Sequence, residues 1–277
     1  LCFGLHASPL ETLRPYLAPQ IKIIVLLKDG ESVTNLSKWL TQEGFGKSDL
    51  FIMESLGFKN EKVRHTKANV LDFDNIEHPV CLAIIISGNG TVIPYSSGKP
   101  DFLFLNDGQI TKQPIRALTI SAMAPKPFEH LWDIGSGSGS ISIEWLLASN
   151  TNTASAIEIL SKRADQIKLS AKNFGLDKLS VYNNDINEII DTLQKPDVIF
   201  VGGGLTEQLL LRIWKLINSE TRIIINSVTL ETTSLLIEAH KKYGGSLHKF
   251  ELSNITNLGK KRAWSKSYPI VQWVVKK

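Results

Sequence analysis

The chain has 277 residues, of which 43% are hydrophobic and 21% are charged, and its formal net charge is +4. These values are typical of a soluble globular protein with one or two domains, and so modest a charge argues against a dedicated nucleic-acid binder. No apolar run approaches the roughly 20 residues that cross a bilayer, and no signal peptide is visible. Cys2 and Cys81 suggest free thiols in a reducing cytoplasm, and no metal-binding motif is present.

The first part of the chain, residues 1–98, alternates apolar strands with helices. Helices are predicted at 9–20 and 32–44, and strands at 21–27, 49–54, 62–66 and 80–86. No catalytic constellation is visible there. The segment SGNGTVIPYSSGKPDF is rich in Gly, Ser and Pro, which is typical of a linker. We therefore expect two domains, residues 1–98 and residues 99–277.

The second part is a regular alternation of strands and helices after a first helix that stops before Pro125. Strands are predicted at 130–134, 154–159, 179–182, 197–201, 222–227, 247–252 and 270–275. Helices are predicted at 140–149, 161–174, 186–193, 205–218 and 231–243. The last strand has no helix before it, which indicates an antiparallel partner. This order predicts an α/β fold with a seven-stranded, doubly wound, Rossmann-like sheet.

A strand, a glycine-rich turn and a helix follow one another in LWDIGSGSGSISIE, residues 131–144. Such a turn holds nucleotides in α/β proteins, because glycine lets a ligand approach the bare backbone. The turn consists of Gly135, Ser136, Gly137, Ser138 and Gly139. The acid Asp133 stands where dinucleotide-binding turns usually have an apolar residue. It suits the cationic amino-acid end of S-adenosylmethionine, either directly or by fixing the loop; the alternative is a tight structural turn.

Three further features lie where a nucleoside site would need them. Glu158 ends the second strand, where a carboxylate can bind ribose hydroxyls, although it could be an ordinary surface acid. Asp185 follows the third strand and could accept a bond from the adenine amine while Ile186 packs on the ring; Asp185 equally suits a helix N-cap. Gly203 is the centre of a triple glycine after the fourth strand, which leaves room for a bulky substrate. Together these features predict a class I S-adenosylmethionine-dependent methyltransferase.

Other classes stay open at this point. A methyltransferase acting on RNA or protein is possible, but VGGG stands where amino-methyltransferases of nucleic acids carry an NPPY-like motif. The second part contains no cysteine, which excludes a cysteine-nucleophile base methyltransferase. A nicotinamide dehydrogenase is disfavoured by Asp133. A non-catalytic remnant that serves as an interaction surface is the remaining alternative.

Several segments resemble a known family. DGQITKQPIRALTISAMAP, LWDIGSGSGSISIEW, VIFVGGG, NSVTLET and PIVQW resemble the decarboxylating precorrin methyltransferases of cobalamin biosynthesis, over residues 104–277. LHASPLETLRPYL and KDGESVTNLSKWLTQEGFGKSDL resemble the second half of the tetrapyrrole methylase module that precedes this domain in fused bifunctional enzymes. The first half of that module, which carries a glycine-proline loop, is missing. We therefore expect a fragment of a longer protein, with an incomplete site for methylation at C5.

The resemblance implies a function for the second domain. It implies transfer of a methyl group from S-adenosylmethionine to C15 of a precorrin, with loss of CO2 from the acetate at C12, and a homo-oligomer, specifically a homotetramer. Cofactor contacts are implied for Thr111, the 135–139 loop, Glu158 and Ile186 beside Asp185. The many carboxylates of a precorrin could pair with basic side chains; the candidates are Lys112, Arg116, Lys260, Lys261, Arg262 and Lys266.

The basic loop at 260–262 equally fits a solvated surface turn. No residue stands out as a general acid or base, and a structural role fits each of the three candidates, Asp107, Glu144 and His130, better than a catalytic one.

Overall fold

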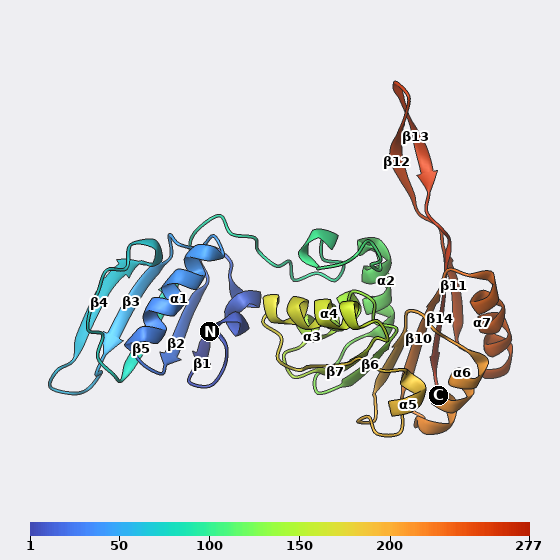
Figure 1. The fold of residues 1–277 in the computed structure, drawn as a ribbon, viewed down its shortest axis with the longest axis horizontal. Helices are drawn as coiled ribbons and strands as arrows, with labels where there is room; N and C mark the ends of the chain where they lie inside the picture. Colours follow the sequence, from blue (N-terminus) through green and yellow to red (C-terminus); the bar gives the residue numbers. More distant parts are fainter. The chain divides into compact units, whose positions relative to one another are not determined.

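The computed structural model describes residues 1–277, which form two compact units (Figure 1). The first unit comprises residues 1–94 and the short segment 172–177, and the second comprises residues 95–171 and 178–277. The division between residues 94 and 95 lies inside the segment whose composition is typical of a linker. None of the helices has the length and apolar character that a membrane span requires.

The first unit is built on a five-stranded sheet in the order β1-β2-β5-β3-β4, in which only the β1–β2 pair is parallel. Helix α1 (Gly30–Gln42) buries Val33, Leu36 and Leu40 in the core of this unit. The chain at 9–20 forms a short 3-10 helix, η1 (Leu10–Tyr16), instead of the predicted longer helix, because Pro15 has no N–H to donate. The strands are β1 (Cys2–Gly4), β2 (Lys22–Leu27), β3 (Asp49–Glu54), β4 (Lys62–Lys67) and β5 (Val80–Ile85).

The second unit contains the predicted seven-stranded sheet, in the order β11-β14-β10-β9-β6-β7-β8. Its first five strands along the chain are parallel, whereas β14 runs antiparallel to both β10 and β11, as predicted. The strands are β6 (His130–Ile134), β7 (Thr153–Ile157), β8 (Leu179–Tyr182), β9 (Val198–Val201), β10 (Arg222–Ser227), β11 (Ser246–Phe250) and β14 (Ile270–Lys276).

Helices cover both faces of this sheet (Figure 1). Alternate strand residues, among them Trp132 and Trp273, are fully buried beneath α5 (Ile186–Ile189), α6 (Glu207–Leu216) and α7 (Leu230–Tyr243). The other face carries α2 (Gln113–Met123), α3 (Ser140–Ala148) and α4 (Ser161–Asn173). The sheet is thus the middle of three layers, which confirms the predicted doubly wound fold.

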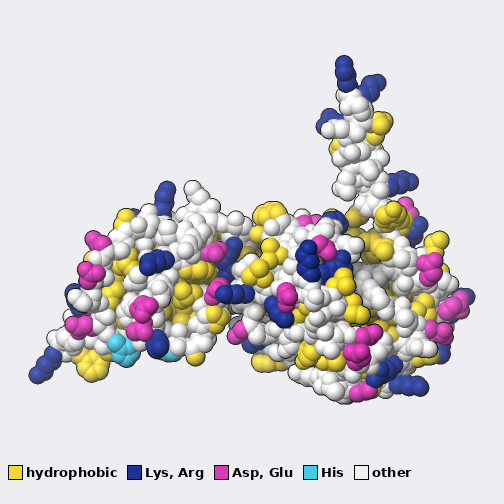
Figure 2. Space-filling model, in the orientation of Figure 1, with side chains coloured by type: hydrophobic (Ala, Val, Ile, Leu, Met, Phe, Trp, Pro, Cys, Tyr) yellow, Lys and Arg dark blue, Asp and Glu magenta, His cyan; other side chains and the backbone are white.

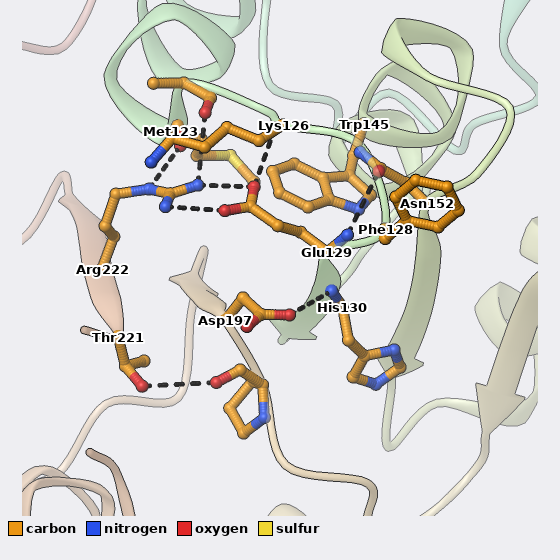
Figure 3. A network of polar contacts seen from close by, with 12 residues as sticks. Met123, Lys126, Phe128, Glu129, His130, Trp145, Asn152, Asp197, Thr221 and Arg222 are labelled. Carbon is orange, nitrogen blue, oxygen red and sulfur yellow. Dashed lines mark hydrogen bonds and ion pairs between the residues drawn. The ribbon is translucent and has the colours of Figure 1, made fainter. Parts of the chain in front are cut away.

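An ion-pair network closes the edge of the sheet where the parallel strands begin (Figure 3). Arg222 of β10 donates to both carboxylate oxygens of Glu129, over 2.9 and 2.7 Å, and to the backbone carbonyls of Met123 and Ala124. Asp197 accepts from the backbone N–H of His130 at 2.8 Å. The network ties the end of α2 to the starts of β6 and β10, at the edge opposite the glycine loop.

A two-stranded hairpin, β12 (Ser253–Leu258) and β13 (Lys261–Lys266), projects from the second unit (Figure 1). We call residues 253–266 the arm. The sequence predicts only a polar loop here, because β12 has no alternation that would bury one face. Ile255, Leu258 and Trp264 are 59%, 68% and 71% exposed, and basic side chains lie along the arm and at its tip (Figure 2).

Candidate functional site

A cavity of about 1200 Å³ opens where the parallel strands of the second unit end. It is bounded by the glycine loop, the ends of β7 and β9, the start of α5, the base of the arm, and the segment before α2. We call residues 99–112 the strap; its last four residues, 109–112, line the cavity. Of the residues predicted to form the site, eleven line the cavity: Thr111, Lys112, Gly135, Ser136, Gly137, Ser138, Glu158, Asp185, Ile186, Gly203 and Lys266.

The glycines of the loop are required for different reasons. Gly135, Gly137 and Gly139 have φ angles of +67°, +58° and +70°, which glycine adopts at little cost. A Cβ on Gly135 would lie 2.7 Å from the carbonyl oxygen of Gly203, and one on Gly139 would lie 2.8 Å from Ile167. A Cβ on Gly137 would meet nothing. Gly135 therefore allows two loops to touch, Gly139 allows a helix to pack, and Gly137 leaves bare backbone facing the cavity.

Asp133 lies behind the loop and does not line the cavity. Its side chain is fully buried, and Oδ2 accepts from the backbone N–H and the hydroxyl of Ser142 at 3.1 and 2.6 Å. Burial raises the pKa of Asp133 to about 6, and the charge of Glu158 adds to the rise. Of the two predicted roles, this geometry fits the fixing of the loop, so we correct its assignment as a direct cofactor contact. The other oxygen, Oδ1, has no hydrogen-bond partner.

Glu158 stands one residue beyond the end of β7 and is 5% exposed. Its Oε2 accepts from the backbone N–H of Gly137 at 2.8 Å, and its Oε1 accepts from that of Leu160 at 2.9 Å. The side chain thus joins the glycine loop to the start of the next helix. A carboxylate offers about four acceptor positions, so this side chain can accept further bonds from a ligand in the cavity.

Asp185 and Ile186 begin α5 at the cavity wall. Asp185 accepts from the backbone N–H of Asn187 at 2.8 Å, so the predicted helix cap is present, while Ile186 is 7% exposed. The residues Asn184 and Asn187 also line the cavity. Neither residue was predicted, because asparagines in a loop carry no distinct signal in the sequence.

Three cations line the cavity: Lys112, Lys266 and Arg163. Arg163 was not predicted, since a basic residue in the first turn of a helix is usually a surface charge. Its Nε donates to Asp107 Oδ2, and its Nη2 donates to the side chain of Gln109, both over 2.9 Å. This pairing lowers the pKa of Asp107. Arg163 therefore fastens the strap to α4 beside the cavity.

Other predicted substrate contacts lie elsewhere. Arg116 is fully buried and paired with Glu144 and Asp101, so it is not free to meet substrate carboxylates, and we correct that prediction. Lys260 lies in the turn of the arm and Arg262 lies in β13, and neither lines the cavity. Lys261 also lies in β13 and outside the cavity, and all three side chains are exposed, so a solvated surface fits them better than a substrate contact.

The three candidates for acid–base chemistry occupy structural positions. His130 is buried between the hydroxyls of Thr153 and Ser155, at 2.7 and 3.1 Å, and burial lowers its pKa. Glu144 is buried beside Arg116, and Asp107 is bound to Arg163. None of the three lines the cavity, so their positions fit the structural role that was expected of them.

The fold and the cavity together define a class of protein. A glycine loop after the first strand of the parallel sheet, an acid after the second and an open loop after the fourth surround one cavity at the carboxyl edge. Ligands of open α/β sheets bind at this edge. The second unit is a class I methyltransferase domain, a fold that it shares with the solved C-terminal domain of precorrin-6Y C5,15-methyltransferase from Rhodobacter capsulatus. That structure superposes with a TM-score of 0.65, is 38% identical, and matches 67% of this chain and 100% of its own.

Sequence comparisons identify the family. The family model described as precorrin methyltransferase domain matches residues 102–277. A protein of Sinorhizobium sp. named precorrin-6Y C5,15-methyltransferase (decarboxylating) is 37% identical over 274 residues. The match covers 98% of this chain and 66% of that relative, so this chain spans about two-thirds of its length. The chain belongs to the precorrin methyltransferase family.

A shorter relative matches a smaller part of the chain. A protein of Saccharolobus solfataricus named probable cobalt-precorrin-6B C15-methyltransferase (decarboxylating) is 35% identical over 160 residues. This match covers 55% of the present chain and 79% of the relative.

Proposed function

We propose that residues 99–277 catalyse transfer of a methyl group from S-adenosylmethionine to C15 of a precorrin, with decarboxylation of the acetate at C12. Membership of the precorrin methyltransferase family, together with the cavity at the carboxyl edge, carries this proposal. The name of the Saccharolobus relative combines C15 methylation with decarboxylation, and its match covers only 55% of the present chain. This supports the assignment of both steps to a single domain.

The residues around the cavity fit S-adenosylmethionine. Glu158 presents a carboxylate with spare acceptor positions for the ribose hydroxyls. Ile186 offers an apolar surface for the adenine ring, and Asp185 beside it offers an acceptor for the exocyclic amine. Gly137, where an added Cβ would meet nothing, lets the amino-acid end approach the backbone. Thr111 would contribute from the strap.

The rest of the cavity fits a large anionic macrocycle. Its volume of about 1200 Å³ exceeds the 300–1,000 Å³ typical of sites for one small ligand, so it can hold a cofactor and a substrate together. Lys112 and Lys266 would pair with the carboxylates of a precorrin, whereas Arg163 is already bonded to Asp107 and Gln109. Ile159 and Tyr268, which are 65% and 86% exposed at the wall, would contact its apolar ring.

The proposed reaction requires mainly that the methyl donor and the acceptor carbon be aligned. S-adenosylmethionine supplies an electrophilic methyl group, and the electron-rich carbon of the macrocycle is itself the nucleophile. The residues of the cavity would hold the two at attack distance and exclude water. Loss of CO2 leaves electrons that the conjugated macrocycle can accept. Asp107, Glu144 and His130 are engaged in other contacts, so we assign none of them a proton-transfer role.

The first unit and the arm have separate proposed roles. Residues 1–98 would be the second half of a tetrapyrrole methylase module, whose complete form would be needed for methylation at C5. The arm would join copies of the chain into a homo-oligomer, specifically a tetramer, in the cytoplasm. An isolated two-stranded hairpin is only marginally stable in water, and three large apolar side chains of the arm are exposed.

Calorimetry and turnover test the proposal together. The chain should bind S-adenosylmethionine, and incubation with precorrin-6Y, the molecule in the name of the Sinorhizobium relative, and methyl-labelled cofactor should give a labelled macrocycle and CO2. A folded protein that yields neither a labelled product nor CO2 would refute the proposal.

A further inference from the structure

One guanidinium holds both ends of the strap. Arg116 of α2 has an exposure of 0%, and four of its five N–H donor positions have partners. Its Nε donates to Glu144 Oε1 at 2.6 Å, and its Nη2 donates to Asp101 Oδ1 at 2.8 Å. Its Nη2 also donates to the carbonyl of Lys99, and its Nη1 donates to the carbonyl of Thr111.

These partners make the strap a closed loop. Lys99 and Asp101 lie at its start and Thr111 lies at its end, where the chain enters the cavity wall. Phe104, midway along the strap, stacks on the guanidinium with 4.5 Å between the ring centre and Cζ. Arg116 therefore fixes the end of the strap at Thr111, while Arg163 holds the side chains of Asp107 and Gln109.

Glu144 joins this loop to the helix that follows the glycine turn. Its carboxylate accepts from Arg116 and from the backbone N–H groups of Gly98 and Lys99, at 2.7 and 2.8 Å. Glu144 lies on α3, which begins at Ser140 directly after the glycine loop. The same helix carries Ser142, which binds Asp133. Two walls of the cavity, the glycine loop and the strap, are thus fixed to one helix.

We infer that Arg116 is a positioning residue for the methyl donor. It acts by holding Thr111 and the neighbouring residues at the cavity wall. A contribution to stability does not by itself explain why Arg116 and Glu144 are buried as an ion pair. Such a pair often stabilises a fold no more than well-packed apolar residues would. The inference rests on the proposed function, in which the strap contacts S-adenosylmethionine. Its structural part, that Arg116 orders the strap, can be measured without any ligand.

The chain supplies a matched control at the other edge of the same sheet (Figure 3). Arg222 also donates to one carboxylate and to two backbone carbonyls, and its side chain is 16% exposed. None of these partners lines the cavity. Arg222→Met therefore removes a network of the same kind without touching the strap.

Hydrogen exchange on the full chain tests the ordering of the strap. The backbone N–H groups of Gly98, Lys99, Phe104 and Gln109 are hydrogen-bonded in the structure. Arg116→Met should speed exchange in peptides covering 98–112 by about tenfold or more, because their anchor is lost. Arg222→Met should leave these peptides unchanged and speed exchange around 123–130.

Calorimetry with S-adenosylmethionine tests the link to the ligand, at a temperature where every variant is folded. Arg116→Met should raise the Kd by about tenfold, and Arg222→Met by less than about twofold. Arg116→Lys, which keeps a charge beside Glu144 but has no fork to reach Thr111, should fold and bind with an intermediate Kd.

Two results would overturn the inference. One is equal protection of the strap in the Arg116→Met and Arg222→Met proteins. The other is a Kd that changes equally in both. A wild-type chain that does not bind S-adenosylmethionine at all would refute the proposed function instead, and hydrogen exchange would then still decide whether Arg116 orders the strap.

Discussion

Arg116 and Glu144 form a buried ion pair, with 2.6 Å between Nε and Oε1 and side chains that are 0% and 1% exposed. Removing one partner leaves the other charge buried without compensation. We expect Arg116→Met to lower the free energy of unfolding by about 3–5 kcal/mol. In urea unfolding, the double variant Arg116→Met/Glu144→Gln should lose clearly less than the sum of the two single variants. Additive losses would mean that the two residues act independently.

The two glycines at the start of the loop should respond differently to alanine. Gly137→Ala introduces only the strain of a side chain at φ +58°, which costs about 1–2 kcal/mol. Gly135→Ala adds a Cβ 2.7 Å from the carbonyl oxygen of Gly203, so two backbones must separate. Its unfolding free energy should fall by about 3 kcal/mol or more. Equal midpoints in thermal unfolding would contradict the contact between the two loops.

Asp133 should make stability depend on pH. Its pKa is raised to about 6 in the folded chain from 3.8, so the folded state binds the proton more tightly than the unfolded state does. This residue therefore penalises folding above pH 6, and the penalty disappears as the pH falls below 4, a change of about 3 kcal/mol. The stability difference between wild type and Asp133→Asn, measured by urea unfolding from pH 4 to pH 7, isolates this change from that of other acids. A difference that stays constant with pH would show that Asp133 has an ordinary pKa.

Glu158 should decide the affinity for the cofactor. Charge-assisted hydrogen bonds contribute about 1.5–3 kcal/mol, so Glu158→Ala should raise the Kd for S-adenosylmethionine by about 10- to 100-fold. Glu238→Ala, which removes an exposed acid of α7, is the control and should bind like wild type. Calorimetry measures both. Unchanged affinity in the Glu158 variant would remove this carboxylate from the proposed site.

The arm should control assembly. Trp264→Ser and Ile255→Ser remove large side chains that are 71% and 59% exposed. If these residues are buried between copies, each variant should shift the mass seen in analytical ultracentrifugation towards the monomer. Leu230→Ser, which changes an 84% exposed side chain outside the arm, should leave the mass unchanged. A wild-type chain that is monomeric at micromolar concentration would exclude this role.

Elements of the fold were predicted correctly where neighbouring residues in the sequence carry a clear pattern. Most strands of the second unit were predictable because they are short apolar runs between turn residues, as in VIFV before the triple glycine. Asp185 was predictable as a helix cap because its side chain bonds to Asn187, only two residues further along the chain. The arm was not predictable, since none of its strand residues is buried to give a pattern.

Charges were predicted less well than the glycine loop, because a sequence gives their sign and not their burial. Arg116 was expected to meet the substrate, yet its partners Glu144 and Thr111 enclose it in the interior. Arg163 was missed, although it lies at the cavity wall. Both errors depend on where the strap folds, which is set by contacts between residues far apart in sequence, such as Gly98 with Glu144.

The most direct test of the central claim is the fate of a 13C-labelled methyl group. The full chain is incubated with precorrin-6Y and methyl-labelled S-adenosylmethionine, and the product is examined by carbon NMR while CO2 is collected. We predict one labelled methyl group at C15 and one CO2 released for each methyl transferred. Label at any other carbon, or methyl transfer without CO2 release, would contradict the proposed reaction.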